Sequence, residues 1–280
     1  MNQIYHGDNF EILQQILPKY QEAVQCIYCD PPYNTKNKYT YYQDKMLHEN
    51  YLEQMKQRIM ILKEFLCDTG IFWLQADANE VHYLKVLCDE VFERKNFVNE
   101  VIWERSYASR SNNKYLSRNH DTILIYSKKK ERLQFYLLPR TKEANSRYKN
   151  YDNDPRGVWK SDNLSCMSED TKNRYPIINP SGKVCYPPKG RSWRVSKESY
   201  QELLKDNRIW FGKKGSNVPS FKRFLSEVQN GRTVTTVWSW KEVGHTDLAK
   251  KEIKRLFPDI EPFDTPKPEK LLERILSLST

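Results

Sequence analysis

Strand and helix signals alternate along the first hundred residues, and this alternation restricts the fold more than any other feature of the sequence. Residues 24–29 and 71–74 are apolar runs with the length of buried strands. Between them apolar residues recur at helical spacing over 52–66, and a second helical pattern covers 81–91. The first helix is expected to end near Asp68-Thr69-Gly70. Such alternation predicts an α/β fold, with a mainly parallel sheet covered by helices.

Polar residues follow both predicted strands. Asp30 comes directly after the first strand, and Gln75-Ala76-Asp77 follow the second. Ligands of open α/β sheets bind beyond the carboxyl ends of the strands. These two segments are therefore the first candidates for a functional site.

The middle of the chain has a different character. Residues 130–235 are basic, rich in Asn, Ser, Gly and Pro, and weakly periodic. We predict an irregular α+β module over 130–235, inserted into an α/β domain formed by 1–129 and 236–280. In the last segment one helix is expected after Thr246-Asp247, and another from Pro266 with Thr265 as its cap.

The net charge of +10 favours a polyanionic partner. Residues 103–150 hold 12 Lys and Arg against 4 Asp and Glu, and residues 183–223 hold 11 against 3. A plain solvated basic surface is the alternative. Rings on which bases could stack are interleaved with these charges, which favours nucleic acid: Trp103, Tyr107, Tyr115, Trp193, Trp210 and Phe211. The candidate DNA contacts are Arg105, Arg110, Lys114, Arg118 and His120, although a lone His is more often structural.

The sequence supports neither a membrane protein nor a metal-binding protein. No stretch approaches the roughly 18 apolar residues of a membrane span, and the N-terminus lacks the pattern of a signal peptide, so a cytoplasmic protein is expected. Cys26 and Cys29 form the one C-x-x-C, but an offset of three puts them on opposite faces of a strand. We expect structural thiols and no metal site.

The tetrapeptide Asp30-Pro31-Pro32-Tyr33 carries the chemistry. An exocyclic base amine is a poor nucleophile because its lone pair is delocalised into the ring. The Asp30 carboxylate and the Pro31 carbonyl could accept its two hydrogens, with the two prolines fixing the backbone. Tyr33 offers a face on which an extruded base could stack. The other interpretation of these residues is a proline-rich turn with an exposed Asp.

This tetrapeptide, followed by Asn34-Thr35, resembles the amino-methyltransferase signature of beta-class bacterial DNA methyltransferases. Segments 6–9, 71–80, 119–126 and 263–268 resemble further motifs of that class, so the resemblance spans nearly the whole chain. The modification subunits of type III restriction systems look most similar.

The resemblance implies a Rossmann-like methyltransferase sheet with permuted motif order and an inserted target-recognition domain. It implies S-adenosyl-L-methionine as cofactor, with Asp8, Thr265 and Lys267 at the cofactor, and adenine N6 of flipped-out DNA as target. The implied partners are double-stranded DNA, a restriction subunit or a complementing C-terminal polypeptide, and a second copy in a homodimer.

One departure from the family pattern concerns the Gly-rich cofactor loop (F-x-G-x-G), which should follow the helix after Thr265-Pro266-Lys267-Pro268. The nine glycines of this chain contain no G-x-G pair. We therefore expect a chain that is truncated, split or dependent on a second polypeptide, because that loop lets the cofactor approach the backbone closely. The missing loop leaves open a catalytically silent DNA-binding fragment. An RNA amino-methyltransferase is a further alternative, because it would grip an amine in the same way.

Overall fold

The computed structural model of the chain describes residues 2–35, 44–108 and 114–280. The chain divides into two compact units, of which unit 1 comprises Met1–Leu138 with Thr233–Thr280 and unit 2 comprises Pro139–Arg232. Each unit is described separately below.

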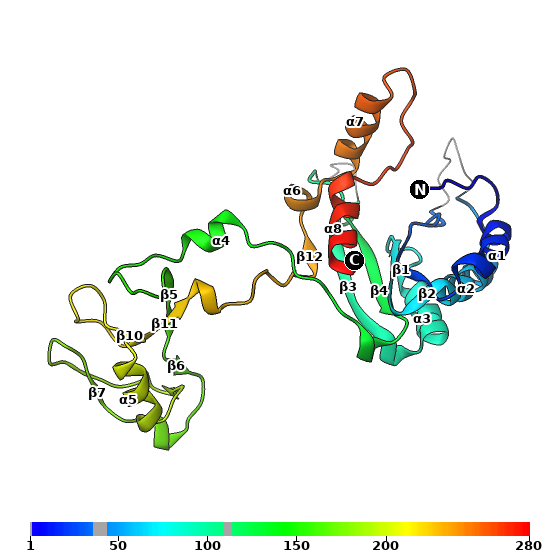
Figure 1. Ribbon diagram of the computed structural model, residues 1–280. Helices are drawn as coiled ribbons and strands as arrows, with labels where there is room; N and C mark the ends of the chain where they lie inside the picture. Colours follow the sequence, from blue (N-terminus) through cyan, green and yellow to red (C-terminus); the bar gives the residue numbers. More distant parts are fainter. Residues whose placement is uncertain (1, 36–43, 109–113) are drawn as a thin grey trace. The chain divides into compact units, whose positions relative to one another are not determined.

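Unit 1 is built on a mixed sheet (Figure 1). Over the described residues the sheet has five strands, in the order β1-β2-β4-β3-β12. β1 runs parallel to β2 and β3 runs parallel to β12, whereas β4 is antiparallel to both of its neighbours. The strands are β1 (Val24–Cys29), β2 (Leu66–Ala76), β3 (Phe97–Glu104), β4 (His120–Ser127) and β12 (Val237–Trp238). The predicted α/β class is confirmed.

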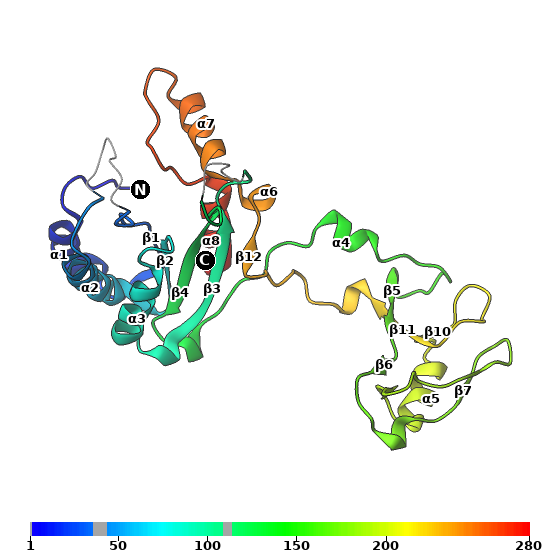
Figure 2. The same ribbon diagram turned by 180° about the vertical axis from the view of Figure 1, so that it is seen from behind.

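Helices cover both faces of this sheet (Figures 1 and 2). One face packs against α2 and α3 through a core that includes Ile59, Phe72 and Leu84. The other packs against α6 and α8 through Trp73 and Leu271. The helices of unit 1 are α1 (Asn9–Tyr20), α2 (His48–Phe65), α3 (Val81–Phe92), α6 (Trp240–Val243), α7 (Thr246–Leu256) and α8 (Glu269–Ser279), with short 3-10 turns at Arg94–Asn96 and Lys130–Arg132.

The two cysteines of the C-x-x-C lie on opposite faces of β1, as predicted. Cys29 packs with the α2 and α3 core, and Cys26 packs with the α8 core. All six cysteines are free, and the described residues contain no cluster of His, Cys, Asp or Glu that could hold a metal ion.

The predicted end of the first long helix is wrong. α2 ends at Phe65 and the chain continues directly into β2 at Leu66. Val24 pairs with Leu66 and Cys26 pairs with Ile71, so residues 67–70 form an irregularity inside the paired strand. Gly70 fits there because an added Cβ would lie 2.9 Å from the Val24 carbonyl oxygen. Strand pairing therefore overrides the local Asp-Thr-Gly stop signal.

The start of the last helix also differs from the prediction. α8 begins at Glu269 with Pro268 at its N-cap, so Thr265 is not the cap. Thr265 and Lys267 each precede a proline, and a residue before proline is disfavoured in the helical conformation. Residues 265–268 therefore stay outside the helix. The predicted helix after Thr246-Asp247 is α7, which is capped by the His245 ring.

Unit 2 consists of short strands and helices, with a three-stranded antiparallel sheet in the order β10-β11-β5 among its described residues. Its core includes Leu164, Trp193 and Phe211. The elements are α4 (Lys142–Ser146), β5 (Trp159–Asn163), β6 (Ser165–Cys166), β7 (Ile177–Ile178), β8 (Val184–Cys185), β9 (Ser192–Trp193), α5 (Lys197–Lys205), β10 (Ile209–Trp210) and β11 (Ser220–Phe224), with 3-10 turns at Thr171–Asn173 and Leu225–Glu227.

Over the described part of the chain, the helices are too short or too polar for any of them to span a membrane.

Candidate functional site

Asp30 stands at the carboxyl end of β1 with both carboxylate oxygens engaged. The Tyr33 hydroxyl donates to Oδ1 over 2.9 Å, and the Lys267 ammonium donates to Oδ2 over 2.6 Å. The Lys267 Nζ also lies 5.6 Å from the centroid of the Tyr33 ring. Residues from the start and the end of unit 1 therefore meet at one carboxylate.

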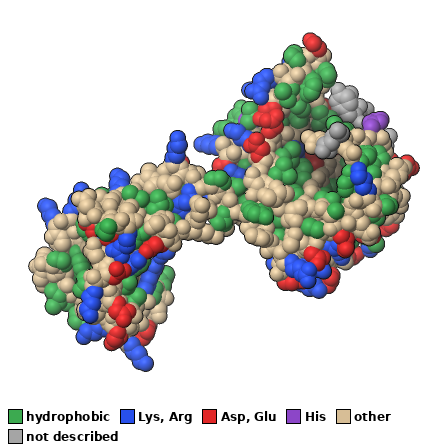
Figure 3. Space-filling view, in the orientation of Figure 1, with side chains coloured by type: hydrophobic (Ala, Val, Ile, Leu, Met, Phe, Trp, Pro, Cys, Tyr) green, Lys and Arg blue, Asp and Glu red, His purple; other side chains and the backbone are tan. Residues whose placement is uncertain are grey.

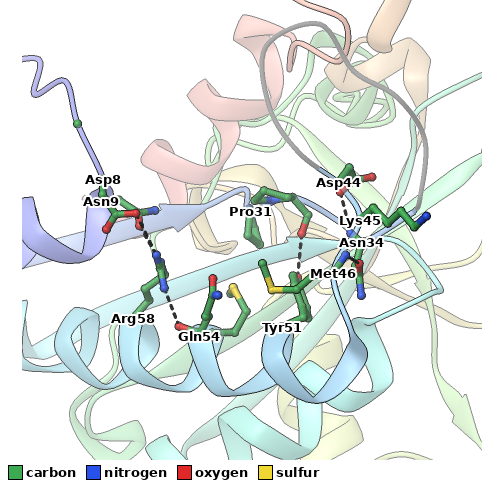
Figure 4. A pocket seen from close by; sticks show the side chains of 13 residues that line it. Asp8, Asn9, Pro31, Asn34, Asp44, Lys45, Met46, Tyr51, Gln54 and Arg58 are labelled. Atoms are coloured by element: carbon green, nitrogen blue, oxygen red, sulfur yellow. Dashed lines mark hydrogen bonds and ion pairs between the residues drawn. The ribbon is translucent and has the colours of Figure 1, made fainter.

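The backbone after Tyr33 is held by buried polar contacts (Figure 4). Asn34 is buried with a φ of +53°, a conformation that Asn tolerates better than most residues. Its side-chain amide donates to Glu80 over 2.9 Å, and its backbone N–H donates to Asp44 over 2.8 Å. The Tyr51 hydroxyl of α2 donates to the Pro32 carbonyl over 2.9 Å. These contacts fix the direction in which the Asp30–Tyr33 segment leaves the sheet.

A second polar network lies behind the Tyr33 hydroxyl. Asp121, at the start of β4, has its Oδ2 3.5 Å from that hydroxyl. Gln75 donates to the same oxygen over 3.1 Å, and the Tyr28 hydroxyl donates to the Gln75 side-chain oxygen. Arg105 forms an ion pair with Oδ1 of Asp121 across 2.8 Å. Antiparallel pairing of β4 with β2 and β3 brings these side chains to the carboxyl end of β1.

Burial shifts several pKa values at this site. Burial raises the pKa of the Tyr33 hydroxyl well above its ordinary value, and the negative charges of Asp30 and Asp121 add to the shift. Burial also raises the pKa of Asp121, against the opposing effect of Arg105. The pKa of Asp77 is raised by burial as well. Tyr33 therefore acts as a neutral hydrogen-bond donor and not as an acid near neutral pH.

Two pockets share the loop that contains the tetrapeptide. One, of about 330 Å³, is lined by Pro31, Pro32 and Asn34 together with Asp8 and Arg58 (Figure 4). The other, of about 500 Å³, is lined by Tyr33, Thr35, Asp77, Arg105, Asp121, Thr265 and Lys267. Neighbouring residues of this loop thus line two different cavities, Pro31, Pro32 and Asn34 the first, and Tyr33 and Thr35 the second.

The candidate cofactor residues line different pockets. Asp8 lines the first, where it caps α1 through the Phe10 N–H and lies 3.3 Å from the Arg58 guanidinium. Thr265 and Lys267 line the second. The Thr265 carbonyl accepts a hydrogen bond of 3.2 Å from the Lys267 ammonium, which orients that cation toward Asp30.

The candidate DNA contacts do not form one cluster. Arg105 is turned into the second pocket by its ion pair with Asp121. Arg118 lies within 3.4 Å of the Asn79 side chain, Lys114 is exposed beside the Tyr115 ring, and His120 is exposed at the start of β4. Arg110 lies outside the described residues.

The structure corrects part of the expectation about aromatic residues. Trp103, Trp193 and Phe211 are buried core residues and cannot stack on a base, because neighbouring side chains cover their faces. Tyr107 and Tyr115 are exposed, at 60% and 82% of their surfaces. Counting rings in a basic window could not separate these two groups.

Sequence reasoning missed the residues that support the tetrapeptide. Asp44, Glu80 and Asp121 all contact it or the residue that follows it, and none was a candidate. Asp121 lies just before an apolar strand run, Ile123 to Ile125, which places it near a strand end but does not show which residues it contacts. Asp44 and Glu80 lie in polar stretches that give no comparable signal.

Comparison with known proteins identifies the family. The family model described as DNA methylase matches residues 24–280. This chain belongs to that DNA methylase family. This match confirms the family of DNA methyltransferases that the tetrapeptide indicated.

Relatives of this DNA methylase chain include type III Mod subunits, which confirms the expected likeness, and a type II methyltransferase. It is 30% identical to the type III enzyme StyLTI Mod subunit of Salmonella typhimurium, over 98% of this chain and 45% of the relative. It is 25% identical to the EcoP15I Mod subunit of Escherichia coli, over 98% of this chain and 51% of the relative. It is 28% identical to the type II methyltransferase M.KpnI of Klebsiella pneumoniae, over 94% of this chain and 68% of the relative. The chain thus spans about half the length of these two type III relatives.

Proposed function

We propose that this chain methylates the N6 amine of adenine in double-stranded DNA, using S-adenosyl-L-methionine, within a restriction-modification system. The observation that carries the proposal is the Asp30 carboxylate, fixed at the carboxyl end of β1 between the Tyr33 hydroxyl and the Lys267 ammonium. Membership of the DNA methylase family supports the reaction class.

The amine is activated by acceptors placed on this segment. Asp30 accepts one hydrogen of the amine, and the Pro31 carbonyl accepts the other. These two hydrogen bonds localise the lone pair on the nitrogen. As the nitrogen gains a methyl group it loses one proton, and Asp30 is placed to receive it. The half-buried Tyr33 ring supports an extruded base and offsets part of its unstacking cost, a few kcal/mol.

The side chains of the two pockets could bind part of the cofactor. Lys267 offers a cation to the carboxylate of the methionine portion, at a point already set by Thr265. Asp8 lines the neighbouring pocket with Asn9 and Gln54, which offer amide groups to a polar ligand. When bound, the cofactor supplies a methyl group on a positively charged sulfur, so its departure needs no metal.

Unit 2 is proposed as the target-recognition domain, corresponding to the predicted 130–235. Residues 139–232 hold 20 Lys and Arg against 10 Asp and Glu, whereas the rest of the chain holds 26 of each. The entire positive excess of the chain therefore belongs to unit 2, and Lys and Arg recur across its visible face (Figure 3). Such a surface favours the phosphate backbone of DNA. The relatives named as Mod subunits make a restriction subunit the second proposed partner.

The test is methyl transfer from labelled S-adenosyl-L-methionine to duplex DNA, followed by digestion and identification of the methylated nucleoside. N6-methyladenine is expected, and Asp30→Ala should abolish it. N4-methylcytosine would contradict the assigned base, and undiminished transfer by Asp30→Ala would contradict the assigned role. Salt-sensitive DNA binding without cofactor binding or transfer would favour the silent DNA-binding fragment.

A further inference from the structure

Asp121 is a buried carboxylate that the proposed chemistry does not use. Its surface is 3% exposed, and its Oδ2 lies 3.5 Å from the Tyr33 hydroxyl. Burying an ionised carboxylate is costly unless it is paired and hydrogen-bonded. The position of Asp121 beside the tetrapeptide therefore calls for an explanation.

The partners of Asp121 hold it in one orientation. Arg105 forms an ion pair with Oδ1, and Gln75 donates to Oδ2. Gln75 is itself fully buried, and its side-chain oxygen already accepts from the Tyr28 hydroxyl. The Gln75 nitrogen is thus the group that faces Asp121, and Oδ2 remains directed at Tyr33.

A phenol has one hydrogen to donate, and in the structure Tyr33 gives it to Asp30 over 2.9 Å. A target amine bound to Asp30 would compete for the same carboxylate. A partly buried hydroxyl that loses its acceptor loses free energy, so a second acceptor within reach of Tyr33 is favourable at that moment. The Oδ2 of Asp121 is that acceptor.

We propose that Asp121 is a positioning residue for Tyr33, to which the Tyr33 hydroxyl donates when the target amine occupies Asp30. The inference rests on the proposed function, since it needs an amine at Asp30. The hydroxyl changes partner while the ring keeps its place, so the surface offered to the base is the same before and after the amine arrives. Arg105 and Gln75 act one step further away, by holding the Asp121 carboxylate.

A double-mutant cycle between Tyr33→Phe and Asp121→Asn tests this role. The target site is first mapped on DNA methylated by the unmodified chain. Two quantities are then measured: the single-turnover rate of methyl transfer at saturating cofactor and DNA, and the fluorescence of 2-aminopurine placed next to the target adenine, which rises when that adenine leaves the base stack. Each single variant should lose about tenfold in rate, which is the loss expected for one hydrogen bond. Each should also show a smaller fluorescence rise than the unmodified chain. The double variant should lose no more than either single variant, because Asp121 acts through the hydroxyl that Tyr33→Phe removes. Losses that multiply, to about a hundredfold, would overturn the inference.

Asp89→Asn is the matched control. Asp89 accepts a hydrogen bond of 2.7 Å from the Tyr126 hydroxyl and pairs with Lys85 at 2.6 Å, so it repeats the Tyr-Asp-cation arrangement at the other end of β4. The Asp89→Asn variant should be less stable than the unmodified chain, but each folded molecule should transfer methyl groups at the unmodified rate. If Asp121→Asn does not fold, Asp121→Glu keeps the charge opposite Arg105 and enters the same cycle. An unmodified chain with neither transfer nor a fluorescence rise would defeat the proposed function itself, whereas an active chain with multiplying losses defeats the positioning role alone.

Discussion

The Nζ of Lys267 lies 2.6 Å from Oδ2 of Asp30, although 237 positions separate the two residues in the sequence. The contact joins the segment before α8 to the end of β1. Lys267 reaches it from an extended stretch with a proline on each side, Pro266 and Pro268, which limits the backbone conformations of that stretch. The cation is therefore held at the site before any ligand arrives.

Lys267→Gln should weaken binding of S-adenosyl-L-methionine by roughly 10- to 100-fold, because hydrogen bonds to charged groups contribute about 1.5–3 kcal/mol. Calorimetric titration of the chain with the cofactor measures this loss. Lys270→Gln is the control, since Lys270 is exposed on the following helix. If the two variants bound S-adenosyl-L-methionine equally well, the assignment of Lys267 to the cofactor site would be wrong.

Asn34→Ala should destabilise unit 1 by about 3 kcal/mol. It loses two side-chain hydrogen bonds, one donated to Glu80 and one accepted from the Met46 backbone N–H, and Ala adopts the positive φ poorly. Asn34→Gly loses the same hydrogen bonds but accepts the backbone conformation, so it should recover about 1 kcal/mol of that loss. Denaturant unfolding of both variants separates the two causes. If the Asn34→Gly variant had the same unfolding free energy as the Asn34→Ala variant, the positive φ would make no contribution to the loss.

Unit 2 should lose stability in acid partly through Asp154. The Arg156 guanidinium, hydrogen-bonded to Asp154, holds the pKa of that carboxyl well below its usual range. A depressed pKa means that the ionised form stabilises the fold, fully above the unfolded pKa of about 3.9 and progressively less as pH falls below it. Asp154→Asn should therefore be less stable than the parent at pH 7, with a smaller difference at pH 3. Unfolding free energies at the two pH values measure this, with the exposed Asp170→Asn as control. A difference that does not shrink in acid would contradict the assignment.

Lys213 and Lys214 are exposed in the loop between β10 and β11 of unit 2. Changing both to Gln should reduce the slope of log affinity for DNA against log salt by up to roughly 1.8, about 0.9 for each phosphate that is no longer neutralised. Fluorescence anisotropy over a salt series gives the slope. The matched control changes Lys56 and Lys95 to Gln, because both are already paired with acidic residues in unit 1. An identical change of slope in the two double variants would mean that the charge of unit 2 has no special part in binding.

The sequence was sufficient to place Asp30 at the end of a strand, because an apolar run and a Pro-Pro turn are local signals. It was also sufficient to put Cys26 and Cys29 on opposite faces, since strand periodicity is fixed by backbone geometry. Both results depend on residues close together in the chain.

The contact between Asp121 and Tyr33 could not be predicted from such local signals. Asp121 reaches Tyr33 only because β4 inserts antiparallel between β2 and β3, a pairing that no local pattern specifies. The same limit explains the aromatic residues, since Trp103 and Tyr107 are four positions apart and have opposite environments. Burial is decided by which elements pack together, and that information is spread over the whole chain.

Leu138 and Thr233 mark the two points at which the chain leaves unit 1 and returns to it, and β12 then pairs with β3. An insertion bounded in this way can be exchanged for another without breaking the strand order on which Asp30 and Asp121 depend. Under the proposed function, recombination at these two junctions exchanges the target-recognition domain and leaves the methyl-transfer residues of unit 1 unchanged.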